Sequence, residues 1–448
     1  MSPRCRMDTG AGLPHSGNQS PYRREREADN HDGARGDACA HTVLEGEVVM
    51  SGVESSPVPL RRGVAQLGRG ERGGIRRLRP VRSIRVIGFV LLASATAGVI
   101  VPSAAAAGAR GRSAGKAPSS LLYAALNGVA ATSARNVWAV GQYQSGTVLR
   151  TLIVHWNGKT WRQVPSPNPA RSGDTLSGVA ATSTASAWAV GEQNGHSLLL
   201  GWNGKSWRRV RCPDIGNLAG VAATSAANAW AVGIGGPNGD KTAIEHWNGR
   251  AWRVAPSPVK VGNLLGVAAT SASNAWAVGF SGNPTTGSGL AEHWNGKAWR
   301  VVHSPAGAGG VIGVAATSAS NAWAVGGANG QSAGTSISVI NHWNGGTWRR
   351  IASPNPVPGG ATFFGVAVTS ASNAWAVGTD FDFFITPENV IAHWNGKAWK
   401  LVPSPIHDGS LNSVTATSAG SAWAVGSGDS GALIEHWNGT RWKGTTFG

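Results

Sequence analysis

The chain has 448 residues, 39 lysines and arginines against 22 aspartates and glutamates, and only three cysteines. Its length allows two or three domains, and three cysteines without a Cys-x-x-Cys pair exclude a disulfide scaffold and a cysteine-based zinc site. The net charge of +17 raises the question of an anionic partner, such as a nucleic acid or a charged surface.

The first segment, 1–75, is rich in glycine, arginine, serine and aspartate and has no hydrophobic periodicity. Such a composition cannot bury enough surface to offset the entropy lost on ordering. We therefore expect a disordered basic segment. Because the signal-like sequence follows only after this segment, the true start of the protein is expected downstream, with Met50 as one candidate.

The next segment, 76–107, has the three parts of a secretory signal peptide. The basic stretch "RRLRPVRSIR" precedes the apolar run "VIGFVLLASATAGVIV", and small residues follow in "PSAAAA". The apolar run, 86–101, is shorter than the roughly 20 residues that a spanning helix needs. We expect export, cleavage and no stable membrane insertion afterwards, with a retained signal anchor as the alternative. A linker, 108–120, follows.

The remaining segment, 121–448, repeats one unit that contains a W-A-V-G element and, further on, a W-N-G element followed by another tryptophan. Seven copies of three tryptophans account for all 21 in the protein, which fixes the repeat number. The W-A-V-G tryptophans are Trp138, Trp188, Trp230, Trp276, Trp323, Trp375 and Trp423. The W-N-G tryptophans are Trp156, Trp202, Trp247, Trp294, Trp343, Trp394 and Trp437, and their partners are Trp161, Trp207, Trp252, Trp299, Trp348, Trp399 and Trp442.

Each copy predicts four short β-strands, here called A to D, because short apolar runs are bounded by serine, asparagine and glycine. A repeat of this length is typical of propeller blades. A four-stranded sheet with two apolar faces becomes stable when such sheets pack face to face in a ring. The sequence therefore predicts an all-β, seven-bladed β-propeller of four-stranded antiparallel blades. Strand A, nearest the axis, is expected to carry only small side chains besides leucine and valine.

The repeat resembles the kelch/galactose-oxidase propellers and the Asp-box propellers of the photosystem-assembly-factor type. The stretch "HWNGKTW" keeps Gly158, Thr160 and Trp161 of the Asp-box pattern S-x-D-x-G-x-T-W, but Trp156 stands where that pattern has aspartate. The glycine pair that kelch blades carry after strand B occurs only at 326–327. The resemblance implies the propeller fold and leaves the branch open.

The W-N-G element predicts a β-hairpin with a two-residue type I′ turn at 157–158. In that register His155 pairs with Thr160, and Trp156 and Trp161 are diagonal neighbours on one face. His155 then points to the other face of the hairpin.

We interpret the repeated aromatic residues as structural. The blade signature in the first and fourth copies consists of Trp138, Trp156, Trp161, Trp276, Trp294 and Trp299. The recurring histidines are His155, His246, His293, His342, His393 and His436. Because they lie on the third strand from the axis, we expect them to point between blades, far from one another, and to serve in packing. We predict no metal and no cofactor.

Most lysines and arginines of the repeats follow the W-N-G element, on or next to strand D. Charges on an exposed edge strand oppose edge-to-edge association, so we expect a monomer. A ring of charges around a disc is a poor groove for nucleic acid, and none is expected as a partner. Binding to an anionic wall polymer is left open.

Catalysis needs convergent groups, such as paired carboxylates or a nucleophile beside its base. Only 12 of the 22 acidic residues fall in the repeats, and we expect none of them on the inner strand. The sequence therefore favours a protein that is not an enzyme. The alternative is a secreted carbohydrate-active enzyme.

Antiparallel order places the A–B and C–D turns on one side of the disc and the B–C and D–A loops on the other. The first set is nearly identical in all copies, whereas the second varies, and variable loops on a rigid scaffold carry recognition. We therefore predict a binding or scaffolding module for a protein or glycan at the cell surface. The candidate ligand-binding loop contains Asp380, Phe381, Asp382, Phe383 and Phe384.

Overall fold

The computed structural model describes the propeller region except for short loops. The described ranges are 123–169, 173–236, 238–282, 287–303, 310–329, 336–356, 360–380 and 387–447. The expected disordered segment 1–75, the signal peptide 76–107 and the linker 108–120 lie outside these ranges and stay predictions.

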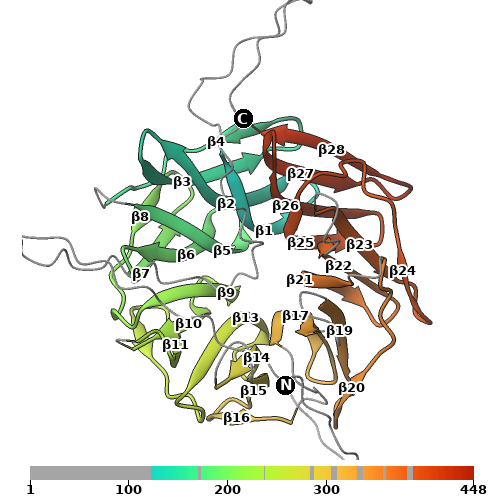
Figure 1. Cartoon of the computed structure of the whole chain (residues 1–448). Coiled ribbons are helices and arrows are strands. Elements are labelled where there is room, and N and C mark those ends of the chain that lie inside the picture. The colour runs from blue at the N-terminus through green and yellow to red at the C-terminus, as the bar shows by residue number, and fades with distance from the viewer. Residues whose placement is uncertain are drawn as a thin grey trace, which may run out of the picture. The chain divides into compact units, whose positions relative to one another are not determined.

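The described residues form seven four-stranded antiparallel sheets around a common axis (Figure 1). In each sheet the strands follow chain order from the axis outwards, so the first strand is the inner strand and the fourth lies at the rim. The predicted seven-bladed propeller is therefore confirmed. Within the described ranges, no helix has the length and apolarity that a membrane span requires.

The first four blades contain sixteen of the strands. Blade 1 consists of β1 (Ala125–Ser133), β2 (Asn136–Ser145), β3 (Val148–Trp156) and β4 (Trp161–Gln163). Blade 2 consists of β5 (Asp174–Ser183), β6 (Ser186–Gln193), β7 (His196–Trp202) and β8 (Trp207–Arg209). Blade 3 consists of β9 (Asn217–Ser225), β10 (Asn228–Gly235), β11 (Lys241–Trp247) and β12 (Trp252–Val254). Blade 4 consists of β13 (Gly262–Ser271), β14 (Asn274–Ser281), β15 (Ser288–Trp294) and β16 (Trp299–Val301).

The last three blades complete the ring. Blade 5 consists of β17 (Gly310–Ser318), β18 (Asn321–Asn329), β19 (Ser336–Trp343) and β20 (Trp348–Arg350). Blade 6 consists of β21 (Ala361–Ser370), β22 (Asn373–Asp380), β23 (Asn389–Trp394) and β24 (Trp399–Leu401). Blade 7 consists of β25 (Ser410–Ser418), β26 (Ser421–Gly428), β27 (Gly431–Trp437) and β28 (Trp442–Phe447).

The W-A-V-G strand gives each blade one face with large side chains and one face with small side chains. In blade 4, Trp276 and Val278 belong to the apolar core shared with blade 5. The alanines of the same strand, Ala275 and Ala277, belong to the core shared with blade 3. Because side chains alternate along a strand, tryptophan and valine of one blade pack onto alanines of the next. This alternation of large and small residues allows seven similar sheets to interlock.

The hairpin between the third and fourth strands differs from the predicted register. Trp156 pairs directly with Trp161, so the loop has four residues, 157–160, instead of two. His155 therefore pairs with Arg162, two residues beyond its predicted partner. The asparagine side chain that opens the loop accepts hydrogen bonds from two backbone N–H groups, at 2.9 and 3.0 Å. This Asx geometry competes with the expected type I′ turn.

The ring closes between blades 7 and 1 without an exchanged strand. β1 is the inner strand of blade 1, and it packs against β25. The side chain of Asn412 donates to the carbonyl of Leu126 at 3.0 Å, and Ser413 accepts from the N–H of Val129 at 3.3 Å. Among the described residues, packing and hydrogen bonds therefore close the ring.

Candidate ligand site in the axial cavity

A β-bulge interrupts the inner strand of every blade at the same place. The pairing between the first two strands skips one residue, which is the x position of the L-x-G-V pattern. A bulge re-aims the side chain of its unpaired residue. The seven unpaired residues, here called the bulge ring, are Asn127, Ser177, Ala219, Leu265, Ile312, Phe364 and Asn412.

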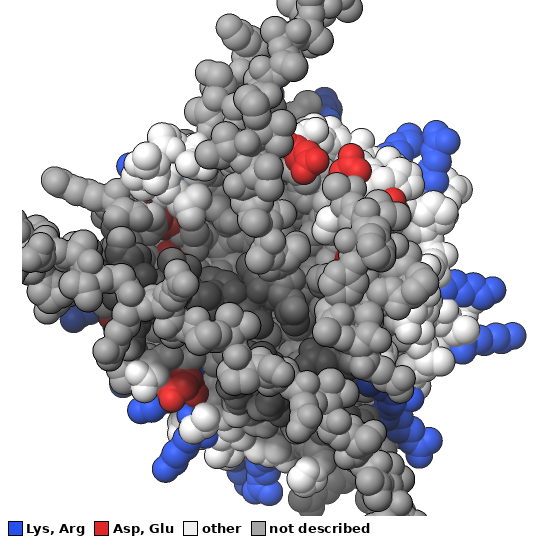
Figure 2. Space-filling view, in the orientation of Figure 1, with Lys and Arg blue, Asp and Glu red and all other residues white. Residues whose placement is uncertain are grey.

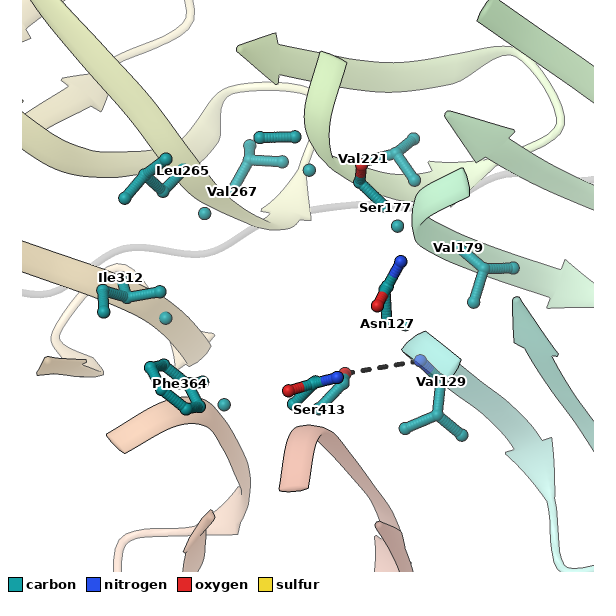
Figure 3. Close-up of a pocket in the computed structure, with 18 of the residues that line it drawn as sticks. Asn127, Val129, Ser177, Val179, Val221, Leu265, Val267, Ile312, Phe364 and Ser413 are labelled. Carbon is teal, nitrogen blue, oxygen red and sulfur yellow. Dashed lines mark hydrogen bonds between the residues drawn. The ribbon is translucent and has the colours of Figure 1, made fainter. Parts of the chain in front are cut away.

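The bulge ring lines a cavity of about 480 Å³ on the propeller axis (Figure 3). Such a volume lies within the usual range for small-ligand sites. The expectation that strand A carries only small side chains besides leucine and valine is wrong, because Ile312 and Phe364 are bulge-ring residues. The expectation that it carries no acid is also wrong, because β5 begins at Asp174, which is fully buried.

The wall of this cavity has two chemically different halves. Blades 3 to 6 contribute Ala219, Leu265, Ile312 and Phe364, which form an apolar half together with the neighbouring valines. Blades 7, 1 and 2 contribute asparagine and serine at the same positions, and Gln142, Thr175 and Glu192 add further polar groups. The halves face one another across the axis (Figure 3).

The glycine after each bulge residue allows the inner strands to approach closely. A Cβ atom placed on Gly266 would lie 2.5 Å from the carbonyl oxygen of Ile312 in the next blade. A Cβ atom on Gly313 would lie 2.6 Å from the carbonyl oxygen of Phe364. Blade 7 has Ser413 at this position, where its hydroxyl accepts the hydrogen bond from blade 1. The glycine that blades 1 to 6 share at this position therefore allows the narrow spacing of the strands around the cavity.

Hydrogen bonds fix the polar half. Asn127 Nδ2 donates to Gln142 Oε1 at 2.6 Å and to the carbonyl of Leu176 at 2.8 Å. Asn412 is held in the same way by the bond to blade 1. The bonds to the carbonyls of Leu176 and Leu126 run from one blade to the next, so these two asparagines also tie neighbouring inner strands together.

Glu192 is the ionisable group of this wall. It lies near the end of β6, opposite Thr175 in the β5–β6 register. Asn217 Nδ2 of blade 3 donates to its Oε2 at 3.2 Å. Partial burial raises the pKa of the Glu192 carboxyl above its ordinary value.

The cavity belongs to the side of the disc that carries the B–C and D–A loops. Its residues come from the first half of each inner strand, from the ends of β2 and β6, and from Leu149 near the start of β3. These strand ends all meet at that side. A ligand on this face would therefore meet both the variable loops and the cavity mouth.

The predicted loop at 380–384 is described only at its first residue. Asp380 ends β22, is buried, and accepts a hydrogen bond on Oδ1 from the N–H of Glu388 at 2.8 Å. It therefore anchors the base of the loop. Phe381, Asp382, Phe383 and Phe384 lie outside the described residues, and their role in binding stays a prediction.

The repeated histidines lie inside the blades. In blade 1, His155 Nε2 lies 2.7 Å from Asn136 Oδ1, and its ring centroid lies 4.1 Å from that of Trp138. Burial lowers the pKa of His155. In blade 2, which has Gly201 at this position, a Cβ atom would meet Val210 at 3.1 Å. Each imidazole therefore packs against the tryptophan of the second strand of its own blade.

Three glutamates are buried on the third strands of blades 3, 4 and 7. Ser257 donates to Glu292 at 2.7 Å, and Ser404 donates to Glu435 at 2.6 Å. Glu245 has no hydrogen-bond partner among the described residues. Cys212 stands at the position in its blade that corresponds to those of the two serines. Burial, and secondly the negative charge of Glu245, raise the pKa of the Cys212 thiol to about 12.

A second hollow lies at the edge of blade 2, around His196 and Asp214. These side chains approach to 2.6 Å but are both more than half exposed to solvent. Asp214 also accepts from the N–H of Ser197 at 3.1 Å. The raised pKa of the Cys212 thiol in the same hollow disfavours a nucleophilic thiolate. The contacts of Asp214 with His196 and Ser197 therefore hold the segment after β8 against the start of β7.

The charged groups are distributed differently from the polar groups of the cavity. Lysine and arginine side chains project from the outer edge of the disc (Figure 2). The fourth strands supply many of them, and their basic residues are exposed, as at Arg253 and Arg300. The expected charged rim is therefore present.

Comparison with known proteins supports the fold and does not extend to function. No protein-family model and no curated protein matches the chain. Among solved structures, YCF48 from Cyanidioschyzon merolae is 15% identical, with a TM-score of 0.46, over 72% of this chain and 97% of that one. The GH74 xyloglucanase from Xanthomonas campestris is 13% identical, with a TM-score of 0.50, over 72% and 55%. The acylaminoacyl peptidase from Pyrococcus horikoshii is 10% identical, with a TM-score of 0.50, over 73% and 53%.

At such low identities the similarity shows the fold alone. Two of the similar structures are of YCF48, with TM-scores of 0.48 and 0.46. The predicted propeller fold is confirmed by the strand topology. The kelch branch stays a prediction.

One feature of the sequence marks the residues that line the cavity. Within L-x-G-V the leucine, glycine and valine positions vary little, whereas x is asparagine, serine, alanine, leucine, isoleucine or phenylalanine. A position that varies between constant neighbours marks a place where the copies differ in chemistry. Its location on the axis required the bulge, which the repeat pattern does not reveal.

Proposed function

We propose that the protein is an exported binding module whose ligand enters the axial cavity from the side of the B–C and D–A loops. The observation that supports it best is the bulge ring, in which one repeated position has diverged into an apolar half and a polar half. Apolar walls with a few placed polar groups are typical of small-ligand sites. Propeller scaffolds host many functions, so the proposal depends on this site.

The cavity supports binding better than glycoside hydrolysis. The usual hydrolytic mechanism uses two carboxyl groups flanking the scissile bond. The described residues of the cavity wall include one carboxyl group, that of Glu192. If incubation of the full chain with polysaccharides releases reducing ends, the proposal of a non-enzymatic binding module is wrong.

The binding proposal is tested with 4-phenylbutan-1-ol, a neutral probe with an apolar body, titrated into the full chain by calorimetry. Ile312→Asn should weaken its binding roughly tenfold, because a buried aliphatic side chain contributes about 1.5–3 kcal/mol. The variant should fold, since asparagine already stands at the same position in blades 1 and 7.

Val254→Asn is the matched control, because Val254 lies on the outer strand β12 and is 57% exposed. Its affinity for the probe should equal that of the unchanged protein. Absence of measurable binding, or equal weakening by both substitutions, would contradict the proposal.

A further inference from the structure

The cavity differs in charge from the protein around it. Although the chain has a net charge of +17, the described residues that line the cavity include no lysine, arginine or histidine. Glu192 is the one acidic residue among them. The cavity therefore offers a negative group in a neutral wall, while the positive groups project from the rim (Figure 2).

No described cation neutralises this carboxylate. The hydrogen bond to Glu192 comes from the neutral amide of Asn217, and it reaches Oε2 only. Neither the ion pair between His196 and Asp214 nor that between His407 and Glu388 involves Glu192. A partly buried carboxylate without a cationic partner gains from a positively charged ligand, because the interaction is screened less than at the surface.

Another residue of the cavity wall also presents an acceptor. Asn127 uses both hydrogens of its Nδ2 group, on Gln142 and on the carbonyl of Leu176. Its Oδ1 accepts no hydrogen bond from the described residues. The polar half therefore offers oxygen acceptors to a ligand, which suits a group with several N–H donors.

The apolar half lies across the axis from Glu192. In a ring of seven blades, blades 5 and 6 lie opposite blade 2, which carries Glu192. Figure 3 shows Ile312 and Phe364 across the cavity from Val179 of blade 2. A ligand that spans the cavity would meet a carboxylate at one end and aliphatic and aromatic carbon at the other.

We infer that the ligand is an amphipathic cation, with an apolar body against Leu265, Ile312 and Phe364 and a protonated nitrogen beside Glu192 and Asn127. This inference depends on the proposed binding function and specifies the ligand class. The same chemistry is offered by a free hydrophobic amine and by a lysine side chain of a partner protein.

The head group is tested with three probes that share one apolar body: 4-phenylbutylamine, 4-phenylbutan-1-ol and 4-phenylbutyrate. The amine should bind the full chain roughly tenfold more tightly than the alcohol, because hydrogen bonds to charged groups exceed neutral ones by about that factor. The carboxylate should bind more weakly than the alcohol. In Glu192→Gln, which keeps the side-chain shape, amine and alcohol should bind within about twofold of each other.

The outcomes separate the inference from the proposed function. If the alcohol binds and Ile312→Asn weakens it, but the amine is not preferred or Glu192→Gln leaves its preference intact, the inference fails and the binding function stands. If none of the three probes binds, both fail. The two ligand sources are compared with acetyl-Leu-Lys-amide, using the same dipeptide acetylated on Nζ as its control.

If the unacetylated dipeptide binds at least as tightly as the amine, and the acetylated one does not, the cation is a protein side chain. Weaker binding of the dipeptide than of the amine assigns the site to a free small molecule. Tighter binding of the acetylated dipeptide would overturn the inference.

Discussion

The three tryptophans of each blade have different environments. Trp294 donates its indole N–H to the carbonyl of Ala272, so it ties the hairpin to the A–B turn. Trp276 and Trp299 are buried, and their N–H groups have no oxygen partner among the described residues. Trp348 of blade 5 meets Trp276 edge-on at 5.0 Å, an arrangement that aromatic quadrupoles favour. Packed area and ring geometry therefore supply the cohesion.

Replacing one of these tryptophans tests that account. Trp276→Ala should lower the free energy of unfolding by about 3–5 kcal/mol, because it removes a fully buried ring that contacts two tryptophans of the next blade. Tyr123→Ala, at a side chain that is 80% exposed, should change it by less than about 0.5 kcal/mol. Urea denaturation measures both. A loss below about 1 kcal/mol in Trp276→Ala would contradict the structural role.

The same strand position carries different chemistry in different blades. On the third strand, the residue before the H-W pair is glutamate in blades 3, 4 and 7, valine in blade 1 and alanine in blade 6. Burial raises the pKa of Glu245 to about 8 and those of Glu292 and Glu435 to about 7. These carboxyl groups are therefore protonated in the folded protein over a range in which they are ionised in the unfolded chain.

This difference predicts the pH dependence of stability. Burial also lowers the pKa values of the six repeated histidines, which has the opposite effect on stability below about pH 6.5. Between about pH 7 and 8, where these histidines are largely neutral in both states, the glutamates make the folded state bind more protons than the unfolded state, so stability falls as pH rises. We expect a melting temperature about 3 °C higher at pH 7 than at pH 8. Glu245→Gln should flatten the slope, whereas Asp429→Asn, at an exposed turn, should not. Calorimetry at several pH values measures this, and equal slopes in both variants would refute it.

The closed ring makes the interface between blades 7 and 1 different from the other six. No chain connection crosses it, and β28 extends to Phe447, where the other fourth strands have three residues. The extension pairs with β27 as far as Ala432, and Phe447 packs against the core shared with blade 1. The longer last strand therefore strengthens the seam.

Removing this packing should loosen the ring. Phe447→Ala should lower the free energy of unfolding by about 1–3 kcal/mol, since it deletes apolar contact at the seam. Thr445→Ala, on the exposed part of the same strand, should be close to neutral. Hydrogen exchange should show faster opening of β1 and β27 in Phe447→Ala only. Unchanged exchange there would show that the extension does not hold the seam.

The repeat could be predicted because its signals are local. Three tryptophans per copy, the last two always five residues apart, the W-A-V-G alternation and the glycine-rich turns each lie within one blade, so they indicated strand type, strand number and blade number. The predicted hairpin register was wrong because the side chain of Asn157, the first loop residue, accepts a hydrogen bond from the backbone N–H of Lys159 at 2.9 Å. That competition between turn types depends on side-chain geometry that residue identity alone does not determine.

The sequence by itself determined that this protein is a ring of seven tryptophan-rich blades with a variable loop side. Only the tertiary structure decided where the candidate binding residues come together, because the cavity wall joins residues from all seven blades, such as Asn127 and Asn412. Seven bulges turn one position of the pattern towards the axis, and closure of the ring brings Glu192 opposite Ile312 and Phe364. Local periodicity specifies each blade, whereas a site shared by blades exists only after the blades have packed.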